Sequence, residues 1–256
     1  MTKKQYGTVL ITGAAQRIGR EIAYGLASEG RAVAIHYKNS SVEALKIESD
    51  IKKAGGNAYA IQCDLADETA VSSLIAKINI KLPPVTALIN NASLFERDDV
   101  SDVTKSSWDL HMAINLRAPF ILTQSLANGL RKNEKANIIN ILDQRVENLT
   151  PYFISYTLSK SALWTLTKTT ASALAPNIRV NAIGPGATLP SIRQSKEQFA
   201  RQVGSTPLKL QVNVSEIANA VKFILATNSM TGQLITLDSG QHLGWSQPDP
   251  MNEPDE

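Results

Sequence analysis

Short apolar, β-branched runs alternate along the chain with longer segments of helical periodicity, and this alternation constrains the fold more than any other feature. Seven such runs predict β-strands, at residues 8–12, 32–37, 58–63, 86–90, 137–142, 179–183 and 233–237. The segments between them space apolar residues as one helix face does, and they end at glycines such as Gly30 and Gly55. Strands separated by helices predict an α/β fold: a doubly wound parallel sheet of about seven strands, with helices on both faces and binding loops at its carboxyl edge.

The composition predicts one globular domain. The chain has 256 residues, of which 43% are hydrophobic, and no low-complexity linker divides it. We expect a single domain over residues 1–245 and a flexible, proline-rich, acidic tail at 246–256. Because the net charge of +3 is dispersed rather than gathered in runs, neither nucleic acid nor a membrane surface is an expected partner.

The sequence lacks a recognisable secretory signal and membrane span and has a single cysteine, which predicts a cytoplasmic protein. The N-terminus lacks the apolar core of a secretory signal, and no window reaches the roughly 18 apolar residues of a membrane span. A single cysteine, Cys63, excludes an internal disulfide and a multi-cysteine metal site, so no metal is expected. We expect Cys63 to be a small buried residue at a strand end rather than a reactive thiol.

The stretch TGAAQRIGR follows the first predicted strand and opens a helix. Gly13 permits a tight turn and Gly19 permits close packing of the helix, while free backbone N–H groups at the helix start can receive a pyrophosphate. The stretch HYKNS, after the second strand, lacks the carboxylate that accepts hydrogen bonds from the ribose of NAD. Arg17 and Lys38 offer two cations to a 2′-phosphate instead, which predicts NADPH as the cofactor. The alternative is a pair of solvated cations.

Several neighbours complete this predicted cofactor edge. They are Ile18, His36, Tyr37, Asn39 and Ser40. Ser40 can also cap the next helix. For His36, packing at the strand end is favoured over a contact with phosphate.

A tyrosine and a lysine four residues apart form the second constellation, at Tyr156 and Lys160. On a helix this spacing places both side chains on one face, where an ammonium can stabilise the ionised form of a phenol. Such a pair can donate and recover a proton at a carbonyl, imine or hydroxyl carbon. The spacing alone is common on helix surfaces, but its position after the fifth strand of a predicted dinucleotide-binding chain favours a catalytic role for the pair.

In these motifs the chain resembles the short-chain dehydrogenase/reductase family over nearly its whole length. The motif residues that fall in the family's order are Thr12, Gly13, Gly19, Asp64, Asn90, Asn91, Ala92, Asn115, Tyr156, Lys160, Pro185, Gly186 and Thr188. The resemblance implies a Rossmann-like fold and hydride transfer with a nicotinamide cofactor. It further implies that Tyr156 is the general acid/base, that Lys160 binds the nicotinamide ribose and that Asn115 holds a proton-relay water. By the same resemblance, Asp64 and Leu65 border the adenine, and residues 185–188 line the nicotinamide.

Departures from the common pattern point to the pteridine reductase branch of the family. Thirteen residues before Tyr156, where most members carry a serine, this chain has Asp143; the usual NNAG reads NNAS, ending in Ser93, and Phe95 follows. The branch resemblance implies that Phe95 stacks on a pterin, with Ser93, Arg17, Asp143 and Tyr156 in polar contact with pterin or cofactor. A flat heteroaromatic ring gains from an aromatic face, and a carboxyl beside a phenol could relay a proton to a ring nitrogen.

Alternatives stay open for several of these residues. Asp143 could be structural and Phe95 could anchor a loop, and a reductase of ketones, sugars or acyl thioesters, or a non-catalytic NADPH-binding sensor, would retain the other motifs. Arg145 and Glu147 follow Asp143 and are either substrate contacts or a solvated pair. We expect His111 on a helix surface, His242 in a C-terminal turn and a mobile lid at residues 189–212.

The helices expected at 108–130 and 157–174 resemble the pair that family members pack across a two-fold axis, which predicts a homotetramer or dimer.

Overall fold

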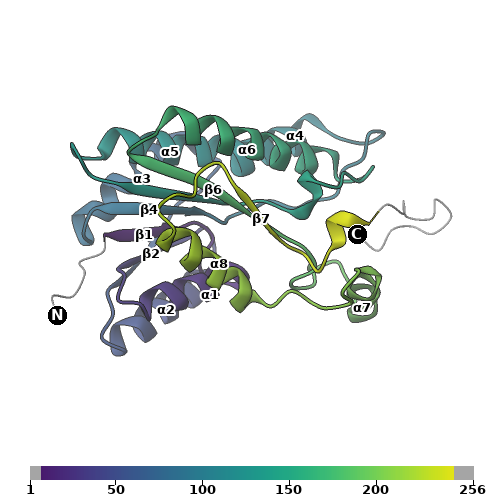
Figure 1. The fold of residues 1–256 in the computed structure, drawn as a ribbon, viewed down its shortest axis with the longest axis horizontal. Coiled ribbons are helices and arrows are strands. Elements are labelled where there is room, and N and C mark those ends of the chain that lie inside the picture. Colours follow the sequence, from purple (N-terminus) through teal and green to yellow (C-terminus); the bar gives the residue numbers. More distant parts are fainter. Residues whose placement is uncertain (1–6, 245–256) are drawn as a thin grey trace.

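The computed structural model of the protein describes residues 7–244, which form a seven-stranded parallel sheet in the order β3-β2-β1-β4-β5-β6-β7 (Figure 1). The strands are β1 (Thr8–Ile11), β2 (Val33–Tyr37), β3 (Ala58–Gln62), β4 (Val85–Asn90), β5 (Ala136–Ile141), β6 (Ile178–Pro185) and β7 (Leu234–Leu237). Each predicted strand is present, with ends that differ by at most two residues. The predicted fold class is therefore confirmed.

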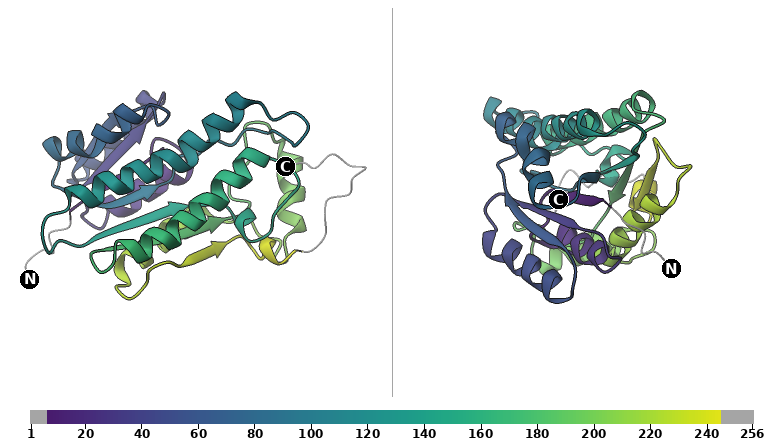
Figure 2. Two further views of the ribbon diagram at one scale, coloured as in Figure 1. Left: turned by 90° about the horizontal axis from the view of Figure 1, so that it is seen from above. Right: turned by 90° about the vertical axis from the view of Figure 1, so that its left-hand side faces the viewer.

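Helices cover both faces of this sheet, as predicted (Figures 1 and 2). One layer consists of α1 (Arg17–Ala27), α2 (Ser41–Lys53) and α8 (Val214–Ala226); the other contains α3 (Glu68–Lys81), α4 (Lys105–Met112), α5 (Ala118–Gly129) and α6 (Ile154–Ala173). Between α4 and α5 the helix continues as a π-helical segment, η1 (Ala113–Arg117). The view along the strands in Figure 2 shows the sheet between the two helical layers.

The strands are apolar in succession because both of their faces are buried. Along β1, Val9 and Ile11 pack in the cluster with α1, α2 and α8, whereas Leu10 packs in the opposite cluster with α3 and α5; all three side chains are fully buried. Burial of apolar surface stabilises the folded state by roughly 25 cal/mol per Å², and the two apolar layers therefore hold the sheet in place. The rigid sheet then positions the loops at its carboxyl edge.

A helix lies beyond that edge, in the segment for which only a mobile lid was predicted. Helix α7 spans Lys196–Ser205, and the side chains of Ser195 and Gln198 form a reciprocal capping box at its start. The polar segment 189–212 therefore contains a regular element that the sequence analysis missed.

The remaining predictions for the fold have mixed outcomes. Cys63 is buried directly after β3, as expected, and burial raises the pKa of its thiol. The prediction for His111 is wrong, because its side chain is fully buried beneath the loop after β4. The tail predicted at 246–256 lies outside the described residues. Over residues 7–244 we find no helix long and apolar enough to cross a membrane.

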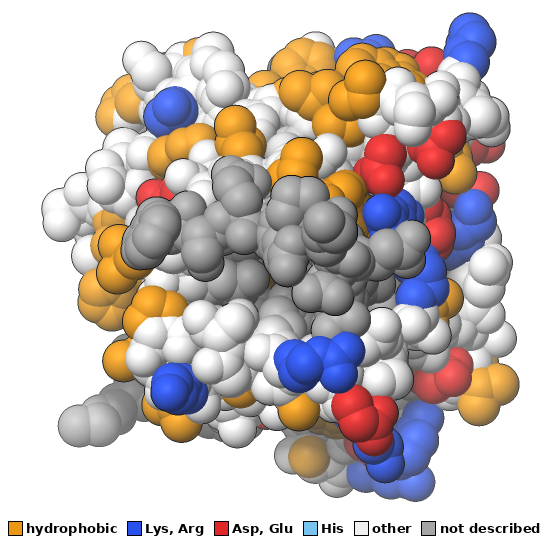
Figure 3. Space-filling model, turned by 90° about the vertical axis from the view of Figure 1, so that its right-hand side faces the viewer, with side chains coloured by type: hydrophobic (Ala, Val, Ile, Leu, Met, Phe, Trp, Pro, Cys, Tyr) orange, Lys and Arg blue, Asp and Glu red, His pale blue; other side chains and the backbone are white. Residues whose placement is uncertain are grey.

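Charged side chains are mixed on the face that carries α7. Figure 3 shows acidic and basic side chains close together along one side of this face, with apolar side chains scattered between them. This pattern agrees with the dispersed charge of the sequence.

Candidate active site

A cavity of about 630 Å³ opens at the carboxyl edge of the sheet, where the loops after β1, β2, β4, β5 and β6 meet. Most predicted site residues line it: Gly13, Arg17, Ile18, Gly19, Tyr37, Lys38, Asn39, Ser40, Asn91, Ala92, Ser93, Phe95, Asp143, Tyr156, Lys160, Pro185, Gly186 and Thr188. Four predicted residues do not line it, namely His36, Asp64, Leu65 and Asn115. Parallel strands bring their carboxyl ends to one edge, so motifs far apart in sequence share this cavity.

The glycine turn after β1 is tight enough to exclude side chains. Gly13 has a φ of +62°, and a Cβ on Gly19 would lie 2.4 Å from the carbonyl oxygen of Gly13. The first turn of α1 carries no acidic residue, and its N–H groups lack intrahelical acceptors, as at any helix start. The turn and helix start thus fit a pyrophosphate.

His36 supports this turn from inside the protein. Its Nδ1 accepts a hydrogen bond from the Gly13 N–H at 3.0 Å, and its Nε2 lies 3.0 Å from the carbonyl oxygen of Cys63. Burial lowers the pKa of His36 to about 4, so the imidazole is neutral and Nε2–H donates to Cys63. His36 is therefore packed at the end of β2, as favoured from the sequence, and its place among the predicted cofactor-binding residues gains no support, because the buried neutral ring lies under the turn and not on the cavity.

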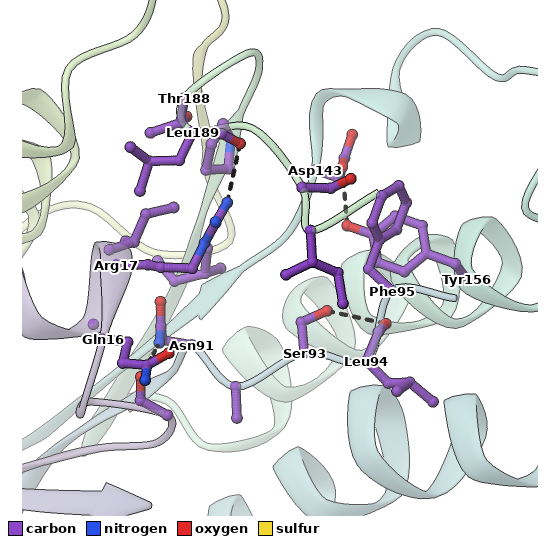
Figure 4. Close-up of a pocket in the computed structure, with 18 of the residues that line it drawn as sticks. Gln16, Arg17, Asn91, Ser93, Leu94, Phe95, Asp143, Tyr156, Thr188 and Leu189 are labelled. Atoms are coloured by element: carbon purple, nitrogen blue, oxygen red, sulfur yellow. Dashed lines mark hydrogen bonds between the residues drawn. The ribbon is translucent and has the colours of Figure 1, made fainter. Parts of the chain in front are cut away.

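The two predicted cations reach the cavity and are engaged there with protein groups. Arg17, with a φ of +52°, donates to the carbonyl oxygen of Leu189 at 3.0 Å (Figure 4). It also donates to the carbonyl oxygen of Pro190 at 2.8 Å. The Lys38 ammonium lies 2.9 Å from the Asp64 carboxylate, and both side chains are partly exposed. Both cations therefore line the cavity, Arg17 bound to the loop after β6 and Lys38 paired with a carboxylate.

Tyr156 and Asp143 form the central pair of the site. The phenol donates to Asp143 Oδ2 at 2.9 Å, and the backbone N–H of Arg145 donates to Oδ1 at 2.8 Å (Figure 4). Burial, followed by the negative charge of Asp143, raises the pKa of Tyr156 well above its ordinary value. Tyr156 is thus a protonated phenol at neutral pH, with a carboxylate beside it.

Lys160 lies one helical turn after Tyr156, and its side chain is almost fully buried. Its ammonium donates to the carbonyl oxygen of Ile141 at 2.9 Å and lies 5.8 Å from the centroid of the Tyr156 ring. Burial lowers the pKa of Lys160 to about 8, against the opposing influence of Asp143. The spacing was expected to stabilise an ionised phenol, but in this structure the phenol is protonated and donates a hydrogen bond to Asp143.

Three aromatic rings meet beside this pair. Phe95 stacks on Phe153 at 4.6 Å between centroids and 10° between planes, and it meets the edge of Tyr156 at 4.6 Å and 70°. The guanidinium carbons of Arg145 and Arg193 lie 5.4 and 5.5 Å from the Phe95 centroid. Only 7% of Arg145 is exposed, which speaks against the solvated pair; a contact between Arg145 and a substrate stays a prediction. Phe153 and Arg193 were missed because nothing in the local pattern marks them.

Asn115 lies in η1 and holds the loop after β4. Its Oδ1 accepts from the Leu94 N–H at 2.8 Å, and its Nδ2 donates to the Leu94 carbonyl oxygen at 2.9 Å and to Ser159 Oγ at 3.0 Å. A π-helical turn is often found at functional sites. Here the amide is fully engaged with protein groups, and its role in holding a relay water stays a prediction.

Glu147 and His242 lie away from the central pair. The Glu147 carboxylate accepts from Thr236 Oγ1 at 2.6 Å, and His242 lies in the 3-10 turn Gln241–Leu243, as expected, with Nδ1 2.8 Å from Asp238 Oδ2. The substrate-contact reading of Glu147 gains no support from this position, because Glu147 does not line the cavity.

Comparisons with known proteins agree with this architecture. The chain is 30% identical over 244 residues to 3-oxoacyl-[acyl-carrier-protein] reductase FabG of Staphylococcus epidermidis, covering 92% of this chain and 99% of that protein. It is 29% identical to L-xylulose reductase of Caenorhabditis elegans, covering 91% and 94%. Among solved structures, FolM alternative dihydrofolate reductase 1 from Brucella canis, complexed with NADP, is 45% identical with a TM-score of 0.92, covering 95% and 97%.

The corresponding FolM from Brucella suis, also in complex with NADP, is 44% identical with a TM-score of 0.89, covering 94% of this chain and 98% of that one. The family described as short chain dehydrogenase matches residues 7–201, which include the glycine turn, Asn115, Tyr156 and Lys160. The chain therefore belongs to the short-chain dehydrogenase family.

Proposed function

We propose that the protein is an NADPH-dependent reductase that transfers hydride to a dihydropterin or a dihydrofolate-like substrate. The observation that carries the proposal is the hydrogen bond from Tyr156 to Asp143 beside the Phe95 ring, all three facing one cavity. The likeness to two FolM alternative dihydrofolate reductases solved with NADP supports it.

The cavity fits a nicotinamide dinucleotide phosphate. Gly13 and Gly19 carry no side chain where the turn is tight, so that backbone N–H groups can meet the pyrophosphate. Lys38 offers charge to a 2′-phosphate, and Lys160 can bind the nicotinamide ribose. When bound, NADPH would supply the hydride.

Reduction of a C=N bond also requires a proton at the nitrogen, and Tyr156 can supply it. Its raised pKa keeps the phenol protonated until the nitrogen becomes basic as the hydride reaches the neighbouring carbon. The phenol then loses its proton to the nitrogen and regains one from solvent through Asp143, which is partly exposed. One hydride and one proton are thus added, and the C=N bond becomes CH–NH.

Phe95 would orient the substrate ring. Phe153 covers one face of Phe95, and the Arg193 guanidinium lies 5.5 Å from the ring centroid, so a flat pterin that stacks at the cavity side would share this space with Arg193. Such stacking is worth about 1 kcal/mol beyond its area burial. Ser93 and Arg17, which line the same cavity, would contact polar atoms at the rim of the pterin or the cofactor.

Carbonyl reduction is the second candidate, favoured by the likeness to FabG and L-xylulose reductase. NADPH oxidation measured side by side with dihydrobiopterin, dihydrofolate, a 3-oxoacyl thioester and a simple diketone separates the two. We expect turnover with a dihydropterin or dihydrofolate, and a loss of at least about a hundredfold in Tyr156→Phe with NADPH binding kept. Turnover of the thioester or the diketone alone would favour carbonyl reduction over the proposed function. If the protein binds NADPH but turns over none of the substrates, a non-catalytic sensor would be favoured.

A further inference from the structure

The loop that carries Phe95 is held on both sides of that residue by one helical segment. Asn115 binds the N–H and the carbonyl oxygen of Leu94, the residue before Phe95. His111 Nε2 accepts a hydrogen bond from the N–H of Glu96, the residue after it, at 3.3 Å. His111 and Asn115 are four residues apart, at the end of α4 and within η1, and both are fully buried. Two buried groups on one side of the helix thus flank the aromatic platform.

The hydrogen bonds of His111 define its tautomer. Nδ1 lies 2.9 Å from the carbonyl oxygen of Ser107, so this nitrogen must carry the proton and donate. Nε2 is then left with the lone pair that the Glu96 N–H requires. Asp98 Oδ2 is 3.8 Å from Nδ1 and accepts from Ser107 Oγ. Although the carboxylate is close, a second proton on Nε2 would face the Glu96 N–H, so this is a neutral imidazole and not an ion pair.

Arg193 contacts the same peptide unit from the opposite side. Its guanidinium donates to the Phe95 carbonyl oxygen at 2.7 Å and to Glu96 Oε2 at 2.6 Å. Arg193 belongs to the exposed loop after β6, whereas His111 belongs to the rigid helical layer. The position of Phe95 is therefore set by a fixed anchor on one side and a loop contact on the other.

We infer that His111 is a positioning residue that, together with Asn115, fixes the Phe95 ring for the substrate. The inference rests on the proposed function in one respect, since it takes Phe95 to be the surface on which the substrate stacks. His111 itself touches neither substrate nor cofactor, because it lies outside the cavity. Without its acceptor, the Glu96 N–H loses its protein partner, and the contact with Arg193 is then left to set the position of the Phe95 ring.

Two substitutions separate the two hydrogen bonds of His111. In His111→Gln the amide oxygen reaches the place of Nε2 and can still accept from Glu96. In His111→Asn the shorter amide reaches the place of Nδ1 and can still donate to Ser107, but nothing accepts from Glu96. We expect His111→Asn to raise KM for a dihydropterin about tenfold, with kcat and the Kd for NADPH within about twofold of the parent. His111→Gln should stay within about threefold of the parent in KM.

A double substitution tests whether the effect passes through Phe95. In a Phe95→Ala background the ring is gone, so adding His111→Asn should change KM by less than about twofold. A further tenfold rise in that background would overturn the inference, as would equal KM values for parent and His111→Asn.

Hydrogen exchange gives a readout that needs no substrate. Exchange of the peptide that spans residues 94–99 should be faster in His111→Asn than in the parent and close to the parent in His111→Gln. If the parent reduces no pterin, the proposed function fails but this measurement still decides the positioning role. Unchanged exchange in His111→Asn, or equal acceleration in both variants with a similar loss of thermal stability, would reject it.

Discussion

Asp143 stands where most family members carry a serine, and in the structure it accepts hydrogen bonds from both the Tyr156 phenol and the Arg145 N–H. A serine there would offer a neutral hydroxyl on a shorter side chain. We expect Asp143→Ser to lower kcat for a dihydropterin at least about tenfold, because the phenol loses the carboxylate through which it regains its proton. Asp143→Asn keeps the shape of the side chain and its hydrogen bond from the Arg145 N–H, so it tests the effect of the negative charge alone. Parent-like kcat in Asp143→Ser would show that the carboxylate has no part in pterin chemistry.

Lys160 predicts a pH dependence for cofactor binding. Burial lowers its pKa to about 8, so the side chain is a cation below that pH and becomes neutral above it. If the ammonium holds the nicotinamide ribose, NADPH affinity of the free protein should be steady up to about pH 7 and fall as pH rises through about 8. Fluorescence titration with NADPH across this range checks it. Lys160→Arg, which stays charged, should show no such fall; an equal fall in both proteins would contradict the assignment.

Lys38 tests the preference for NADPH over NADH. Its ammonium is paired with Asp64 in this structure, so a 2′-phosphate must share or replace that partner. We expect Lys38→Asp to weaken NADPH binding by roughly 1 to 3 kcal/mol, the scale of a charged hydrogen bond, and to leave NADH binding much less affected. Asp64→Asn is the matched control, since it frees the ammonium and should not weaken NADPH binding. Equal Kd values for the two cofactors in the parent would remove the basis of the assignment.

At the scale of single elements, the start of α6 depends on the loop that carries Phe95. Asp98 Oδ1 accepts from the Ser155 N–H at 2.9 Å, and Asp99 Oδ1 accepts from the N–H of Phe153, whose φ is +58°. These bonds satisfy N–H groups that a helix leaves open at its first turn. The helix that presents Tyr156 is thus fastened to the loop that presents Phe95.

Removing Asp98 should loosen this attachment. Burial pushes the pKa of Asp98 up, but hydrogen bonds from Ser107 and Ser155 outweigh it and the pKa is lowered. A lowered pKa means that the stabilisation is complete above about pH 4 and is lost as pH falls through the folded-state pKa. We expect Asp98→Ala to lower the free energy of unfolding by about 2 to 3 kcal/mol at pH 7 and by less in acid, measured by urea denaturation. Asp98→Asn keeps the acceptor for Ser155, so its free energy of unfolding should fall by less. If the difference in free energy of unfolding between the parent and Asp98→Ala does not depend on pH, the role of the Asp98 charge is refuted.

An element can be predicted from the sequence when its own residues carry a clear apolar pattern. The strands are predicted well because β-branched runs buried on both faces leave a strong local signal. Helix α7 has no fully buried residue, and its apolar stripe is short, with Phe199 and Val203 one turn apart. Ser195 and Gln198 nevertheless carry the spacing of a capping box that would have located its start. The π-helical turn around Asn115 was not predicted, since one extra residue per turn hardly changes the apolar pattern over so short a segment.

Among site residues, those in contiguous motifs lie on the cavity, such as Gly13, Lys38 and Tyr156. His111 was misplaced because a polar side chain can be buried when the backbone supplies its partners, and one of its partners, the Glu96 N–H, lies fifteen residues away in the chain. Arg193 could not have been found, since its contacts with Phe95 and Glu96 join segments about a hundred residues apart.

For the whole molecule, we expect a homotetramer or dimer assembled through α4, α5 and α6. Trp108 on α4 and Leu158 on α6 are 38% and 45% exposed, and these two helices pack side by side. Leu158→Arg should shift the mass found by light scattering toward the monomer, because a charge would be buried at the interface. Val42→Arg is the control, since Val42 is exposed on the opposite helical layer. A parent that is monomeric at micromolar concentration would exclude the assembly.

One short segment after β6 touches both halves of the cavity. Leu189 and Pro190 accept hydrogen bonds from Arg17, on the side where we propose that NADPH binds, while Arg193 binds Phe95 and Glu96, on the side that we propose for the substrate. If both ligands bind as proposed, a ligand that changes the position of this segment in one half changes the binding free energy of the other ligand. The coupling is reciprocal by thermodynamic necessity: the factor by which NADPH tightens the substrate equals the factor by which the substrate tightens NADPH.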